Sequence, residues 1–158
     1  MAGRTTAITL LTLALHLCCT AAHTAVWYVD KDNTGTQNGT SWATAFNAIQ
    51  PAVDAAFTAG GGEVWVAEGT YAETRSSLNA DGDGEDTGSL VLRAGVSMYG
   101  GFSGSETALA QKDTNLHLAI IEGASVRDTN GDSMGDAAAY HVVVAASNVV
   151  FDGFKVQN

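Results

Sequence analysis

The chain has 158 residues, of which 17 are acidic and 7 basic, so its formal net charge at neutral pH is −10. This length suits one domain with a sizeable core, and hydrophobic residues make up 46% of the chain. The acidic balance argues against binding to nucleic acid or anionic lipid, because both carry negative charge. Abundant glycine, a single proline at Pro51 and many short β-rich runs predict an all-β chain with tight turns.

Residues 1–25 have the layout of a secretory signal peptide. Arg4 supplies positive charge, residues 7–17 form an apolar run too short to span a bilayer, and small residues follow. Cleavage after either Ala22 or Ala25 fits this pattern, and a buried N-terminal helix is the alternative interpretation. Cleavage removes one basic residue and both cysteines, leaving 6 basic and 17 acidic residues and a net charge of −11. We therefore expect a secreted or cell-surface protein with no disulfide and no further transmembrane segment.

In chain order, residues 26–30 predict the first strand after the signal, apolar on both faces and therefore buried. A polar loop leads to the only convincing helix, whose apolar side chains recur at three- and four-residue spacing. Asn47 could cap this helix with Gln50 as its capping-box partner, or the regular helix begins at Gln50 or Pro51. A run of glycines ends it.

Residues 63–67 alternate in polarity after this glycine run, which predicts a short strand. Val64 and Val66 share one face, and the residues beside and between them share the other. A turn is predicted at residues 68–70, a bend at residues 100–104, and another bend where Gly153 interrupts the last strand. Further strands are predicted at residues 89–93, 96–99, 119–123, 140–145 and 149–156.

Three of these strands begin near Ser97, Ile120 and Val142, a spacing close to the roughly 20–25 residues of a solenoid repeat. The spacing predicts a stack of short strands with residues 26–62 forming a first strand and a capping helix, and residues 63–158 forming the first coils. No cap is expected after the last strand. Either the solenoid is incomplete, or its last edge is exposed and prone to pair with another copy strand to strand.

Several segments together carry a resemblance to a known group of proteins. They are WYVD at residues 27–30 with GTSWATAF at 39–46, GEVWVAEGTY at 62–71 and VSMYGGFSGSET at 96–107, continued by YHVV at 140–143 and FDGF at 151–154. The chain resembles the N-terminal region of secreted bacterial right-handed parallel β-helix proteins, which are pectate-lyase-like in fold and include polymorphic outer-membrane-protein-like surface proteins. The resemblance implies an all-β, right-handed parallel β-helix with an N-terminal capping helix. No stretch matches a lyase or epimerase catalytic motif, so no catalytic residue is carried over.

Two acidic insertions contain candidate metal ligands. Each alternates oxygen-bearing side chains with glycine, as in flexible loops that bind Ca²⁺ through six to eight oxygens. Ser133 and Ala139 stand where an EF-hand loop needs glycine and glutamate, so an EF-hand is rejected. The alternative is that both insertions are solvated turns. The candidate calcium ligands are Asp81, Asp83, Asp128, Asn130, Asp132 and Asp136.

Aromatic side chains provide the other candidate site, because aromatic faces stack on sugar rings. We expect most of them to pack in the core and the cap instead. His141 is expected to be structural or to face solvent rather than to act as a catalytic base. The aromatic residues concerned are Trp27, Trp42, Trp65, Tyr71, Tyr99 and Phe102.

Two functions remain open on the sequence. The first is a non-catalytic exported module for adhesion, scaffolding or contact with a polysaccharide or cell-surface glycan. The second is the N-terminal part of a polysaccharide lyase-like enzyme whose catalytic coils lie beyond Asn158, in which calcium held by the acidic insertions would bridge an acidic sugar.

Overall fold

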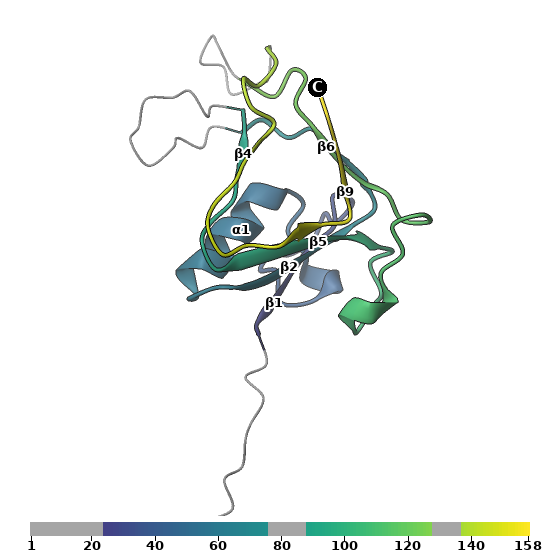
Figure 1. Ribbon diagram of the computed structural model, residues 1–158. Coiled ribbons are helices and arrows are strands. Elements are labelled where there is room, and N and C mark those ends of the chain that lie inside the picture. Colours follow the sequence, from purple (N-terminus) through teal and green to yellow (C-terminus); the bar gives the residue numbers. More distant parts are fainter. Residues whose placement is uncertain (1–23, 76–87, 128–136) are drawn as a thin grey trace, which may run out of the picture.

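The computed structural model describes residues 24–75, 88–127 and 137–158, and within them the chain is mostly β with one α-helix (Figure 1). Two short 3₁₀ helices accompany nine strands in this described part. The helices are η1 (Trp42–Thr44), α1 (Ile49–Thr58) and η2 (Leu109–Gln111). The strands are β1 (Val26–Val29), β2 (Gly62–Ala67), β3 (Gly69–Tyr71), β4 (Leu90–Val91), β5 (Val96–Phe102), β6 (Ala119–Glu122), β7 (Val143–Val144), β8 (Phe151–Asp152) and β9 (Phe154–Gln157).

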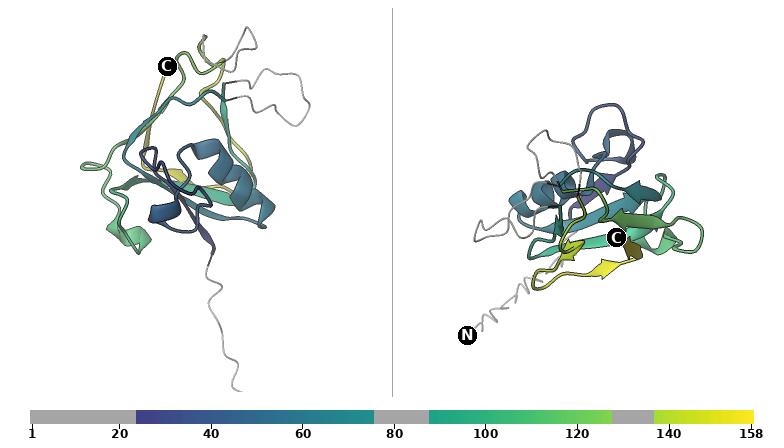
Figure 2. Two further views of the ribbon diagram at one scale, coloured as in Figure 1. Left: turned by 180° about the vertical axis from the view of Figure 1, so that it is seen from behind. Right: turned by 90° about the horizontal axis from the view of Figure 1, so that it is seen from above.

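The strands form three sheets in which all the named strands pair in parallel. Sheet A has the order β1-β2-β5-β8, sheet B the order β3-β6-β9, and sheet C contains β4 and β7. From β2 onward the chain visits sheets A, B and C in turn, and then begins again at sheet A. Figure 1 shows the sheets as the sides of a triangle, and the right view of Figure 2 shows successive circuits stacked as layers.

The predicted repeat spacing is wrong. Ser97 and Ile120 lie in β5 of sheet A and β6 of sheet B, and Val142 directly precedes β7 of sheet C, so these positions are not equivalent. True sheet partners are farther apart: Glu63 pairs with Ser97, a spacing of 34 residues, whereas Met98 pairs with Phe151, a spacing of 53. Loops of different length between the strands change the length of each circuit, so the sequence has no constant period.

The interior of the triangle is filled by aliphatic side chains that point inward from the sheets. The predicted inward face of residues 63–67 is confirmed, since Val64 and Val66 belong to the core cluster of this interior, whereas Trp65 is buried outside that cluster. β1 differs from its prediction: only Val29 is fully buried, and the rest of the strand is half-buried. α1 lies over the end of the stack that β1 begins (Figures 1 and 2) and packs Ile49 into the same core cluster. Burying such side chains is the main stabilising contribution to a fold of this kind.

The predicted Asn47 cap is wrong, because α1 begins at Ile49 after an Ala48 N-cap whose side chain makes no capping bond. Glu73, which follows β3, takes this role: its Oε1 accepts the N–H of Ile49 at 3.1 Å. A carboxylate at a helix N-terminus is favoured by the exposed N–H groups and by the helix dipole. The predicted end of the helix is confirmed, since the Ala59 C-cap is followed by Gly60, Gly61 and Gly62, all with positive φ.

Gln50 faces strand β4 instead of the helix start. Its Oε1 accepts the N–H of Val91 at 2.8 Å and its Nε2 donates to the carbonyl of Val91 at 3.1 Å. The flanking Leu90 and Leu92 N–H groups point the opposite way, to the carbonyls of Val142 and Val144 at the β7 segment. The Gln50 amide therefore takes the place of a neighbouring strand, and it satisfies the backbone N–H and carbonyl groups on the edge of β4 that faces the helix.

Arg75 is another buried polar residue, and the sequence analysis did not select it. Only 2% of its surface is exposed, and its guanidinium donates to three carbonyls, those of Tyr71, Gly88 and Glu122. Glu73 lies 3.5 Å from the guanidinium and supplies an opposite charge. Because a buried arginine is costly unless its donors are paired, these bonds from the terminal nitrogens fix the corner where the chain leaves sheet B, while the buried Nε has no partner among the described residues.

Glycines shift two of the predicted strand boundaries and form a third as predicted. The turn between β2 and β3 is confined to Glu68, because Gly69 already begins β3. β5 continues through the predicted bend as far as Phe102, with a register shift at Gly101. The predicted bend at Gly153 is confirmed and divides the last strand into β8 and β9. A Cβ atom on Gly100 would lie 2.5 Å from the Gly153 carbonyl oxygen, so glycine allows these two layers to approach closely.

Some predictions lie outside the described residues. They concern the signal segment up to residue 23 and the calcium candidates Asp81, Asp83, Asp128, Asn130, Asp132 and Asp136. Across residues 24–75, 88–127 and 137–158, no helix has the length and apolar character needed to cross a membrane.

Candidate functional site

The outer face of sheet A carries an aromatic side chain on three neighbouring strands. Tyr28 of β1 is directly opposite Trp65 of β2, which in turn is opposite Tyr99 of β5. Side chains opposite one another on neighbouring strands lie close together, so this register produces a continuous aromatic row. The row points away from the interior because its members alternate with inward residues such as Val64 and Met98.

Trp42 of η1 and Phe102 at the end of β5 extend this row into a cluster. The Trp65 and Phe102 rings are stacked, with centroids 4.9 Å apart and planes at 7°. Trp42 packs edge-on against Tyr28 at 4.8 Å and lies 5.8 Å from Phe102. Phe102 and Trp65 are buried, whereas Tyr28 and Trp42 keep part of their surface in solvent. The cluster is thus a packed support with two partly accessible rings.

A groove of about 360 Å³ runs between this face and the η2 segment. We call it the sheet A groove, and it is lined by Thr24, Val26, Tyr28, Glu63, Trp65, Thr107, Ala108 and Leu109. The Glu63 carboxylate is held in place because its Oε2 accepts the Nε1–H of Trp65 at 2.8 Å. None of the lining residues is basic. The groove therefore combines an aromatic surface, a carboxylate and threonine hydroxyls.

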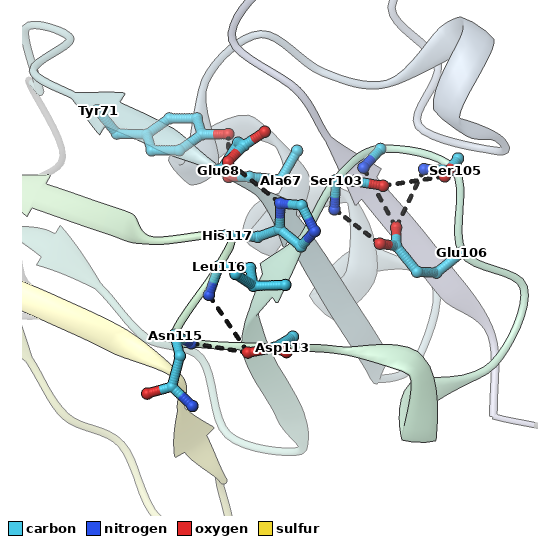
Figure 3. A network of polar contacts seen from close by, with 11 residues as sticks. Ala67, Glu68, Tyr71, Ser103, Ser105, Glu106, Asp113, Asn115, Leu116 and His117 are labelled. Atoms are coloured by element: carbon cyan, nitrogen blue, oxygen red, sulfur yellow. Dashed lines mark hydrogen bonds and ion pairs between the residues drawn. The ribbon is translucent and has the colours of Figure 1, made fainter.

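A network of backbone bonds to Glu106 (Figure 3) holds the turn that leads into residues 107–109, which form one wall of this groove. Glu106 Oε1 accepts the N–H of Ser103 at 2.8 Å, and its Oε2 accepts those of Gly104 and Ser105 at 3.2 and 3.0 Å. Burial disfavours the charged carboxylate, but the Ser103 donors and the other N–H groups outweigh it and lower the pKa of Glu106 below its ordinary 4.5. The Trp42 Nε1–H donates to the Glu106 carbonyl at 2.9 Å, which ties the wall to the aromatic cluster.

Glu68 and His117 form a second polar contact on the same side of the molecule (Figure 3). The His117 Nδ1 lies 3.1 Å from Glu68 Oε2, and the Glu68 carboxylate is about half exposed. The His117 N–H donates to the Asp113 carbonyl, and the Asp113 carboxylate accepts the N–H of Leu116. The contact closes the long loop onto the β2–β3 corner, which accounts for the pair without a catalytic role.

The aromatic residues selected from the sequence fall into different environments. Tyr71 is inside the core, where its hydroxyl donates to the Ala67 carbonyl at 2.9 Å and burial raises its pKa. Trp27 packs against Phe46, at a centroid distance of 6.5 Å. Trp42, Trp65, Tyr99 and Phe102 belong to the outer face of sheet A or to its cluster.

Tyr28 and Glu63 are groove residues that sequence reasoning did not select. The alternation in β1 places Tyr28 on the face opposite Trp27, and this pattern could have found Tyr28. His141 is exposed, as expected of a histidine that faces solvent, and its carbonyl accepts the Ser89 hydroxyl. Among the residues that the structure describes, no group of three or more His, Cys, Asp or Glu side chains could hold a metal ion.

Comparisons of the chain with protein-family models, with curated proteins and with solved structures gave no match. The assignment of a function therefore depends on the fold and on the chemistry of the sheet A groove.

Proposed function

We propose that the chain forms the first coils of a right-handed parallel β-helix and that α1 caps the front of this solenoid. The repeated A–B–C order of the strands supports this proposal, because each strand pairs in parallel with the strand one circuit later. Connections between parallel strands of one sheet are right-handed in nearly all proteins, which favours that hand. The burial of Ile49, Val53 and Ala56 on α1 against the first strands supports the capping role.

On this scaffold we propose a non-catalytic, exported or cell-surface module that contacts a polysaccharide or cell-surface glycan. The observation that carries this proposal is the sheet A groove, in which Tyr28, opposite Trp65, and Glu63, opposite Val26, line the same face of the sheet. Tyrosine offers an apolar ring face that can stack on a sugar and a hydroxyl that can bond to it. The Glu63 carboxylate is an acceptor for sugar hydroxyl groups. The layout of residues 1–25 as a signal peptide supports export.

The charge of the site narrows the class of glycan. The groove contains Glu63 and has no basic residue, and the whole chain carries a net charge of −10. A polyuronate or a sulfated glycan would be repelled unless cations intervened. A neutral or amino-bearing sugar meets no such repulsion, and an amino group could pair with Glu63. The groove volume of about 360 Å³ is at the small end of ligand sites, so contact with a short stretch of glycan is expected.

The test is binding of the secreted protein to a glycan array, followed by calorimetry on the best neutral or amino-bearing ligand. Tyr28→Ala should weaken binding by at least about tenfold, while Tyr28→Phe keeps the stacking ring and most of the affinity. Tyr140→Ala is the matched control, because this tyrosine is exposed and lies outside the groove. Thermal unfolding of each variant shows whether the fold is kept.

Two results would overturn the proposal. One is an array on which no glycan binds above background, together with cell fractionation that finds no surface association. The other is binding that Tyr28→Ala and Glu63→Gln leave unchanged, which would place the ligand on another part of the molecule.

A further inference from the structure

Glu63, the carboxylate of the sheet A groove, is held in place without a positive partner. The side chain is half-buried, its Oε2 accepts the Nε1–H of Trp65 at 2.8 Å, and the hydroxyl of Thr24 lies 3.5 Å from its Oε1. In the described part of the chain, no lysine, arginine or histidine lies within ion-pair distance of Glu63. The Oε1 atom can therefore accept a stronger donor than a distant hydroxyl.

Trp65 fixes this carboxylate because the indole ring is itself immobilised. Trp65 stacks on Phe102 with centroids 4.9 Å apart, and the Tyr28 ring packs nearly perpendicular to it at 5.8 Å and 77°. The Trp65 side chain is 4% exposed, so water has little access to compete for its N–H. A carboxylate that is already oriented loses less conformational freedom when a ligand binds than a mobile one.

Tyr28 and Glu63 both face the groove from neighbouring strands. Tyr28 is opposite Trp65, and Glu63 is two residues before Trp65, so the tyrosine ring and the carboxylate are diagonal neighbours on the same face of sheet A. An aromatic ring attracts a cation over its face, and a carboxylate attracts the same cation and accepts its hydrogens. A neutral hydroxyl group gains neither charge interaction, so this pair of side chains favours a positively charged group.

We propose that the feature recognised in the sheet A groove is a protonated primary amine carried by a sugar, as in a glucosamine unit. The ammonium group donates to Glu63 Oε1 and lies against the Tyr28 ring, while the hydroxyls of Thr24 and Thr107 in the groove lining bond to the sugar. The negative net charge of the chain favours the approach of such a cation. This inference rests on the proposed function and narrows its glycans from neutral or amino-bearing sugars to amino-bearing sugars alone.

Calorimetry with two matched oligosaccharides tests this inference. A short glucosamine oligosaccharide and its fully N-acetylated counterpart share one backbone and differ in the charge on the nitrogen. At about pH 6, where an amine is protonated and an ordinary carboxyl group is ionised, the glucosamine form should bind at least about tenfold more tightly. Glu63→Gln keeps the side-chain shape and an acceptor for Trp65, and it should remove this preference while leaving the affinity for the N-acetylated form nearly unchanged.

The control must separate the groove from the acidic surface as a whole. Asp32→Asn removes the same charge from a side chain that is 77% exposed and lies outside the groove, so it should change the affinity by less than about twofold. Indole N–H resonances of the wild-type protein give a second readout. The chain has three tryptophans, and the N–H of Trp65, which is bonded to Glu63, should shift most when the glucosamine oligosaccharide is added.

The outcomes distinguish this inference from the proposed function. Equal affinity for the two oligosaccharides, weakened in both cases by Tyr28→Ala, overturns the inference and leaves the groove as a site for neutral glycans. A preference for glucosamine that Asp32→Asn weakens as much as Glu63→Gln, or that leaves the Trp65 N–H unmoved, overturns the inference by showing attraction to the whole surface. If neither oligosaccharide nor any other glycan binds, the proposed function is overturned together with the inference.

Discussion

The substitution Gln50→Met tests whether the hydrogen bonds from α1 to the edge of β4 stabilise the fold. Methionine keeps nearly the volume and helix propensity of glutamine but cannot bond to the Val91 backbone. Gln50 is 7% exposed, its two bonds to Val91 measure 2.8 and 3.1 Å, and its Nε2 also donates to Asp54 Oδ1 at 3.2 Å. The substitution therefore removes hydrogen bonds while leaving the packing of α1 almost unchanged.

The expected cost of this substitution follows from the two bonds to Val91 and from the Val91 groups left without partners, because the third bond is to the Asp54 carboxylate, whose side chain is 45% exposed and stays solvated. Each lost bond costs about 1 kcal/mol, and leaving the buried Val91 groups without partners adds about 1 kcal/mol or more. The expected decrease in the free energy of unfolding is about 3 kcal/mol, which corresponds to a fall of roughly 10 °C in Tm for a domain of this size.

Urea unfolding and thermal unfolding followed by circular dichroism measure this effect. Gln37→Met is the matched control, because the exposed Gln37 amide makes a single long bond of 3.3 Å to the Asn47 N–H. The control should change stability by less than about 0.5 kcal/mol. Amide exchange at Val91 should accelerate in Gln50→Met alone. If the Gln50→Met protein were as stable as the control, the conclusion that the Gln50 amide replaces a paired strand at the edge of β4 would be refuted.

Two further predictions concern close approach and acid stability. Gly100→Ala should destabilise the fold by more than Gly95→Ala, because the added Cβ at position 100 would lie 2.5 Å from the Gly153 carbonyl oxygen. A Cβ at position 95 meets open space, so the cost there is only the positive φ of 79°. Equal urea midpoints for the two variants would contradict this prediction. The lowered pKa of Glu106 means that its stabilising contribution is present above about pH 4.5 and is lost as the pH falls through the folded-state value. Glu106→Gln should therefore lower Tm at pH 7 and flatten the fall of Tm in acid, and a wild-type and variant Tm that decline in parallel below pH 4.5 would be inconsistent with this cause.

The sequence alone was sufficient to predict features that depend on residues close together in the chain. The alternation around Val64 and Val66 assigned the inward face of β2, and the apolar spacing after Asn47 located α1 and its glycine stop. The β-rich character of the chain was predicted in the same way. These features follow from periods of two and 3.6 residues, which a short segment fixes by itself.

The tertiary structure decided which segments meet and what closes their edges. The pairing of Glu63 with Ser97 and of Met98 with Phe151 depends on loop lengths that vary from one circuit to the next, so a search for a constant period chose positions in different sheets. Sequence reasoning placed Gln50 in a capping box and did not select Tyr28 or Arg75.

The roles of these residues come from distant parts of the chain. Gln50 bonds to Val91 and Arg75 to Glu122, while Tyr28 takes its place in the groove beside Trp65. A local pattern reports the face on which a side chain lies, but the partner of a polar group is set by segments that only folding brings within hydrogen-bond distance.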